Sequence, residues 1–159
     1  MATIVRAKSR VAHAVASRQE WGKIHSCKQV VPRVWEVSAA GHGGFVLPLS
    51  AVKSSTAREA LRELRVVSTM VDTGRRMYWD RPGSTWYRDQ LPDAEVSEWV
   101  VAEEDCDWAL VVFAVPGFAE ALAERGGMPV EGVVERAAAS VRSYREGAVG
   151  EVLIAELGM

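Results

Sequence analysis

The sequence contains no asparagine and has little cysteine, lysine or isoleucine. Two cysteines in 159 residues are too few for a disulfide scaffold or a four-thiolate zinc site, and they favour reduced thiols in a cytoplasm. No apolar run approaches the ~18 residues that a membrane-spanning helix needs. The N-terminal segment also lacks the uninterrupted apolar core of a secretory signal. We therefore expect a cytoplasmic protein with no membrane partner.

The residues that are present are those of an ordinary globular domain. An apolar content of 48% and a charged content of 25% exclude wholesale disorder, and the length predicts a single domain over residues 1–159. The chain has 15 Arg against 4 Lys and 24 Val against 3 Ile. Codons for Arg and Val tend to be GC-rich, so a GC-rich genome explains the arginine excess without nucleic-acid binding.

The net charge of −2 conceals an asymmetry between the two parts of the chain. Residues 1–90 carry 15 basic and 7 acidic side chains, which gives +8, whereas residues 91–159 carry 4 and 14, which gives −10. Two explanations are open: the two parts neutralise each other within the fold, or one pole faces a partner.

Hydrophobic periodicity predicts an α+β fold. Residues 1–20 form a basic amphipathic helix, residues 33–39 and 45–49 form one hairpin, and residues 66–71 and 76–80 form another. A further strand is expected at 97–102, a short helix after a capping box of Thr56 and Glu59, and C-terminal helices after Pro116 and Pro129. The expected architecture is a small antiparallel sheet of hairpins packed against C-terminal helices, with the basic helix at the N-terminus.

The remaining segments are assigned more loosely. Residues 22–32 are expected to be a linker and residues 81–93 a loop, and residues 50–97 are interpreted as an insertion in the domain. Residues 105–115 and 151–157 suit either a helix or a strand, and the acids that precede the first of these favour a helix there.

A histidine among glycines is the first candidate site. Its imidazole is exposed between residues without side chains, and the neighbouring backbone amides can cradle an anion. A solvated side chain on a purely structural turn is the alternative. The turn consists of Gly41, His42, Gly43 and Gly44.

An acidic run ahead of an apolar segment is the second candidate. On a helix, Glu103 and Asp107 would share one face, as would Glu104 and Trp108. Beside His42, these groups could form a small catalytic, ligand-binding or metal-binding site, but the spacing matches no strict metal motif. We therefore predict no metal and no cofactor, and a dipole-stabilised helix start is the alternative. The run is Glu103, Glu104, Asp105, Cys106 and Asp107, followed by Trp108.

Cys106 is the one candidate nucleophile. A thiol near a helix N-terminus, with His42 as its base, can act as a nucleophile. The neighbouring carboxylates oppose thiolate formation, and burial as a small apolar group is the alternative. No complete catalytic set is present, so an enzyme is not favoured.

Two further surfaces are candidates for binding macromolecules. The basic helix could lie along nucleic-acid phosphates through Arg6, Arg10 and Arg18, or it could pack its apolar stripe on the domain with the charges in water. The pair Trp86 and Tyr87 could anchor a protein contact, or it could belong to the core.

Several of these sequence segments, taken together, resemble one known family. Trp21-Gly22, the segment from Val37 to Phe45 that contains the His-Gly-Gly turn, the acidic run through Ala109, and Pro116 resemble a domain of unknown function found in bacteriophage and mobile-element proteins. Trp99 is displaced from the acidic run relative to that family. The resemblance implies a phage or prophage setting and links His42 with residues 103–108, but it supplies no reaction.

These observations favour a phage-type cytoplasmic accessory protein that binds a host or phage macromolecule, for example to inhibit a host defence system. Trp86, Tyr87 and one of the two oppositely charged parts of the chain would contact a protein partner. The alternatives are a small enzyme or ligand-binding domain that uses His42 and the acidic run, and nucleic-acid binding through the basic helix.

Overall fold

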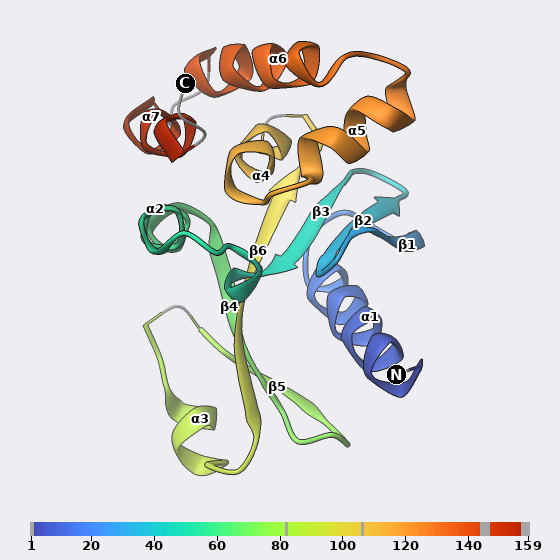
Figure 1. The fold of residues 1–159 in the computed structure, drawn as a ribbon. Coiled ribbons are helices and arrows are strands. Elements are labelled where there is room, and N and C mark those ends of the chain that lie inside the picture. The colour runs from blue at the N-terminus through green and yellow to red at the C-terminus, as the bar shows by residue number, and fades with distance from the viewer. Residues whose placement is uncertain (1, 82, 106, 144–146, 157–159) are drawn as a thin grey trace.

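A computed structural model describes the backbone of residues 2–81, 83–105, 107–143 and 147–156. It describes the side chains of residues 9–62, 69–81, 83–105, 107–143 and 150–155. These residues form one open antiparallel sheet of six strands with helices on both faces, so the predicted α+β class is confirmed (Figure 1). None of the helices is long and apolar enough to cross a membrane among the residues described.

The sheet joins two groups of hairpins through a late strand. Its order is β1-β2-β3-β6-β4-β5, and every neighbouring pair is antiparallel. Both predicted hairpins are present, and the strand predicted near residue 97 lies between them. The strands are β1 (Ile24–Val31), β2 (Val34–Ala39), β3 (Gly43–Pro48), β4 (Val66–Asp72), β5 (Met77–Asp80) and β6 (Glu95–Glu103).

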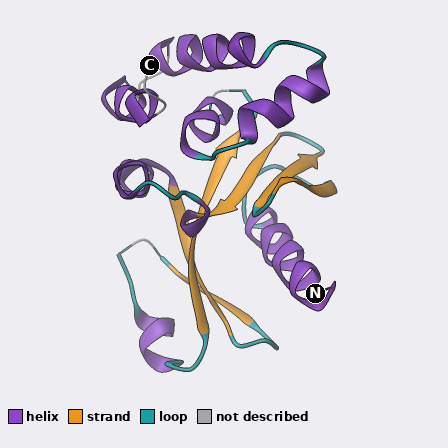
Figure 2. Cartoon of the chain, in the orientation of Figure 1, coloured by secondary structure: helices purple, strands orange, loops and turns teal. Residues whose placement is uncertain are grey.

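The two faces of the sheet carry different helical layers (Figure 2). The predicted basic helix, α1 (Ala2–Ser17), covers one face and buries Val11 and Val15 against Trp35 and Trp99. A larger layer covers the other face, where Phe45 packs edge-on against Phe118 at 5.0 Å between ring centroids. That layer contains α2 (Ser55–Arg65), α4 (Trp108–Ala114), α5 (Phe118–Gly126), α6 (Val130–Ser143) and α7 (Gly147–Glu156).

The glycine turn is shorter than predicted because two of its glycines belong to a strand. Gly43 and Gly44 are the first residues of β3, and both are buried. A Cβ at Gly44 would lie 2.2 Å from the carbonyl oxygen of Ala102 on β6, and one at Gly43 would lie 2.7 Å from that of Val37. These glycines therefore allow β3 to lie close to both neighbours, which is a structural role.

Two segments that we expected to be irregular are ordered. The expected linker contains β1, an edge strand, and the expected loop at 81–93 contains the short helix α3 (Trp86–Gln90). The capping box is also wrong, since the side chain that meets the start of α2 is Ser54, whose Oγ accepts from the Ala57 amide at 3.2 Å. Residues 108–114 and 147–156, which the sequence left open, are helical.

The sheet extends beyond the larger helical layer. In Figure 1, the lower part of β4, β5 and β6 projects below α2 and α4, and α3 lies beside this projecting part. The molecule thus has a thick end, where helices α4 to α7 gather, and a thin end formed by a β-hairpin with one short helix.

Candidate functional site

The structure brings together the glycine turn and the acidic run, which are about sixty residues apart in the chain. Gly44 lies opposite Glu103 in the β3–β6 pairing, and the Glu104 amide donates to the Gly43 carbonyl oxygen at 3.1 Å. The Trp21-Gly22 segment joins them, because the Gly41 amide donates to the Trp21 carbonyl oxygen at 2.8 Å. Three of the four segments that carry the family resemblance therefore meet at one place.

This place contains a surface hollow of about 400 Å³. His42 and Glu103 both line it, together with one basic, one acidic and two uncharged side chains. The hollow therefore offers an imidazole, a carboxylate and a guanidinium to a small polar ligand. The lining residues are Arg18, Gln19, Glu20, Trp21, His42 and Glu103.

The rest of the acidic run does not form the predicted cluster. Glu103 ends β6 and only Trp108 begins α4, so Glu103 and Asp107 do not share a helical face as we expected. Asp107 is buried and accepts a hydrogen bond from the Glu103 amide at 3.4 Å, which makes it part of the turn between β6 and α4. Glu104 and Asp105 are exposed in that turn.

The other predicted residues of this run are Cys106 and Trp108. Trp108 is partly buried against the core of the larger helical layer. Cys106 lies outside the described residues. Within the described ranges, no group of three histidine, cysteine or acidic side chains is placed to hold a metal ion.

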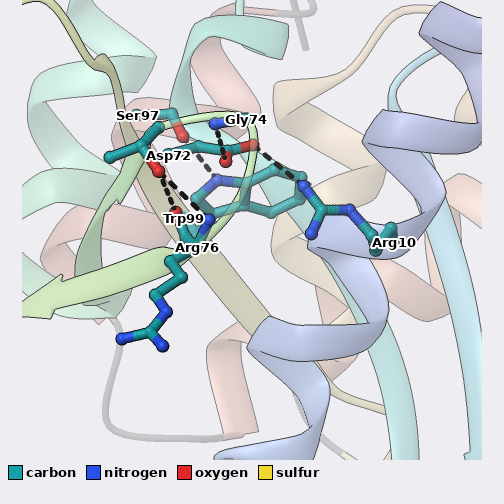
Figure 3. Close-up of polar contacts among 7 residues, drawn as sticks. Arg10, Asp72, Gly74, Arg76, Ser97 and Trp99 are labelled. Carbon is teal, nitrogen blue, oxygen red and sulfur yellow. Dashed lines mark hydrogen bonds and ion pairs between the residues drawn. The ribbon is translucent and has the colours of Figure 1, made fainter.

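The described arginines of the basic helix are engaged inside the fold. Arg10 pairs with Asp72 of β4 at 3.4 Å, and the same carboxylate accepts from the Gly74 amide at 2.8 Å (Figure 3). The Arg18 guanidinium lies 4.7 Å from the ring centroid of Trp79, a cation–π contact. These contacts join α1 and the residue that follows it to the β4–β5 hairpin, although both guanidinium groups remain exposed. Nucleic-acid binding through this helix stays a prediction. The side chain of Arg6 lies outside the described residues.

The short helix α3 is held in place by a buried carboxylate. Asp80, the last residue of β5, is 3% exposed. Its two oxygens accept hydrogen bonds from the backbone amides of Tyr87 at 2.9 Å and Arg88 at 3.2 Å. Amides in the first turn of a helix have no partner within the helix, so this carboxylate acts as a cap supplied from outside.

The capped helix displays a chain of stacked aromatic rings. Tyr78 of β5 lies 5.0 Å from Tyr87 between centroids, and Tyr87 lies 4.7 Å from Trp86 in an edge-to-face arrangement. Trp86 is 59% exposed, the most exposed of the large apolar side chains that the structure describes. We call Tyr78, Trp86, Tyr87 and the exposed Arg88 the α3 patch.

Sequence reasoning found only part of this patch. It singled out Trp86 and Tyr87 but missed Tyr78 and Asp80. The available signal was an acid at the end of a predicted strand, six residues before a tryptophan, followed by a segment too short to reveal its helix by periodicity.

Few ion pairs join the two oppositely charged parts of the chain. In the described part of the chain, Arg62–Glu98 at 3.3 Å is the one ion pair that joins a base from residues 1–90 to an acid from residues 91–159. The bidentate Arg125–Glu36 pair, at 2.5 and 2.9 Å, joins a base of the second part to an acid of the first and raises the pKa of Arg125. Both signs of charge are exposed near α3, at Arg81, Arg88, Asp89 and Asp93, whereas exposed acids line α5 and α6 at Glu120, Glu124, Glu131 and Glu135.

No protein-family model matches the chain, and neither does any curated protein or solved structure. The resemblance to a bacteriophage domain therefore stays a prediction.

Proposed function

We propose that this protein is a phage-type accessory protein that acts by binding another protein, from the host or the phage, through the α3 patch. The observation that carries the proposal is an exposed tryptophan on a helix that is fixed by a buried carboxylate. The phage setting rests on the resemblance of the sequence motifs. A component of a host defence system is one such partner.

The geometry of the α3 patch suits a binding anchor. Tryptophan, tyrosine and arginine are the side chains that most often contribute a large share of binding energy at protein interfaces. Trp86 is already held against Tyr87, and Tyr87 against Tyr78, so little side-chain freedom remains to be lost on association. The patch is therefore organised before the partner arrives.

The surroundings of the patch indicate the chemistry of the partner. Arg81 and Arg88 are exposed beside α3, and so are the acids Asp89 and Asp93. A complementary surface would offer an apolar recess for the indole ring, with charges of both signs around it. We expect salt to slow association, because exposed charges steer the encounter and are screened at high ionic strength.

Affinity capture from host lysate, followed by binding measurements with the purified captured protein, tests this proposal. Trp86→Ala should weaken binding by about 2 kcal/mol or more, roughly thirtyfold. Val152→Ala is the matched control, because Val152 is also an exposed apolar side chain, 37% exposed, but lies on α7. Equal binding by both variants and the wild type would reject the α3 patch as the contact.

A second candidate is supported by the shared hollow of His42 and Glu103. There the chain would bind a small polar ligand between the imidazole and the carboxylate. A thermal-shift screen of polar metabolites tests it: a binder should lose its effect with His42→Ala and with Glu103→Gln, and should keep it with Trp86→Ala. A stabilising ligand that is indifferent to the first two substitutions would remove this candidate.

A further inference from the structure

The strand at the opposite end of the sheet from the α3 patch has an open edge. β1 is eight residues long and pairs only with β2. In the described ranges, no hydrogen bond joins the outer edge of this strand to another segment. Unpaired backbone amides and carbonyls along such an edge are a template for a further strand.

The shape of β1 limits how long the added strand can be. Its pairing with β2 shifts register between Ile24 and Ser26, and again between Gln29 and Val31. Bulges of this kind end regular pairing and twist an edge strand away from its neighbours. The regular part is Ser26–Gln29, so this edge accepts a short extended segment rather than a long strand.

Two hollows lie along β1. One of about 490 Å³ is lined by residues of α1 and β1, and one of about 560 Å³ is lined by residues of β1, β2 and α5. Side chains of an extended segment alternate between the two faces of a sheet. The first hollow borders residues 24–27 on the side of α1, and the second borders residues 28–30 on the side of α5. A segment added along β1 would therefore direct some side chains toward each hollow.

The side chains of the first hollow indicate the kind of ligand. Its lining includes Arg10, which also pairs with Asp72, the imidazoles of His13 and His25, and no acidic side chain among the residues described. The second hollow is mixed, with Lys28 and Arg125 near Glu36 and Glu124. A second copy of this chain that paired through its own β1 would bring Lys28 and no acidic side chain to this edge, so it would not complement the bases there.

We propose that β1 is a docking strand for a short extended segment of a partner protein, with acidic side chains directed into the hollow between α1 and β1. The segment adds to the sheet through backbone hydrogen bonds, and the acidic side chains determine which sequences are accepted. This site is independent of the α3 patch, because the two lie at opposite edges of the sheet.

A displayed library of random decapeptides, selected on the purified chain, tests the proposal. Selected peptides should be enriched in Asp or Glu at alternate positions, and the purified peptides should shift the backbone amide resonances of residues 26–29. The double substitution His13→Glu and His25→Glu should weaken their binding at least tenfold. Both positions are exposed, so the fold should be retained, as circular dichroism will verify.

Arg136→Glu is the control, because it reverses an exposed charge on α6, outside both proposed sites, and should leave peptide binding unchanged. Four outcomes would overturn the proposal: no enriched peptide, enrichment without acids, resonance shifts confined to other segments, or self-association of the free chain through β1. Trp86→Ala should leave peptide binding to β1 unchanged. A negative result in this assay would therefore reject the β1 proposal without bearing on the α3 patch.

Discussion

The two ends of the sheet offer partners different kinds of surface. At one end, β1 is long, and its backbone edge is open between two hollows. At the other end, β5 has four residues, and the helix that follows it displays aromatic side chains. The first surface suits recognition through main-chain hydrogen bonds and the second through side chains, so one sheet can serve two partners without overlap.

A defect at the centre of the sheet should affect both ends together. Gly44→Ala places a Cβ 2.2 Å from the Ala102 carbonyl oxygen and forces β3 and β6 apart. We expect a loss of about 3 kcal/mol or more in the free energy of unfolding, measured by urea denaturation with tryptophan fluorescence.

Gly132→Ala is the matched control for the substitution at Gly44. A Cβ at this position of α6 meets nothing within 4 Å, so alanine should stabilise the helix by about 0.5–1 kcal/mol. A Gly44→Ala protein as stable as the wild type would show that β3 and β6 are not as closely paired as described.

A defect at Asp80 should affect only the α3 end. Asp80→Ala removes the acceptor of the Tyr87 and Arg88 amides and should cost about 2 kcal/mol. Hydrogen exchange should accelerate at these two amides and stay unchanged in β1. Asp93→Ala, an exposed acid nearby, is the control. Acceleration in β1 as well would mean that the two ends are not independent.

The Arg10–Asp72 pair connects α1 to β4 and should contribute little. Arg10 is 44% exposed, and exposed pairs contribute at most about 1 kcal/mol. A double-mutant cycle of Arg10→Ala and Asp72→Asn should give a coupling energy below that value, and the coupling should shrink in high salt. A coupling that salt leaves unchanged would contradict the exposed character of this contact.

The smallest effect is expected from Cys27 on β1. Burial raises the pKa of its thiol. Its contribution to stability is therefore complete below the ordinary thiol pKa and is lost as pH rises through the higher folded-state pKa. Cys27→Ala should flatten the alkaline fall of the unfolding free energy relative to wild type. Identical pH profiles would indicate that this thiol is hydrated in the folded chain.

Periodicity predicted the elements that bury a regular stripe or face. Helix α6 and the β2–β3 and β4–β5 hairpins are of this kind, since core side chains recur at the spacing of the element. Strand β1 escaped prediction because it lies at an edge and is only partly buried, with Ile24 and Cys27 against one core and Val30 and Val31 against the other, so its sequence shows no clean alternation. Helix α3 escaped because its cap is supplied by Asp80 from another element.

The candidate sites divide in the same way. The proximity of His42 and Glu103 was predicted from the resemblance of both segments to one family. The prediction that Glu103 and Asp107 share a helical face was wrong. Strand β6 continues to Glu103, and the sequence does not show where this strand ends and the next helix begins. The exposure of Trp86 was one of two alternatives that the sequence left open, whereas the packing of Tyr78 against Tyr87 depends on a tertiary contact that local sequence does not encode.

The position of β6 between β3 and β4 has a consequence for biosynthesis. A polypeptide leaves the ribosome from its N-terminus, so the β1-β2-β3 group and the β4–β5 hairpin both emerge before residues 95–103 exist outside the exit tunnel. Until then, the edges of β3 and β4 that later pair with β6 are exposed to solvent, and either can pair with another chain. A nascent chain stalled before residue 95 should therefore need a chaperone, and release of residues 95–103 should end that need.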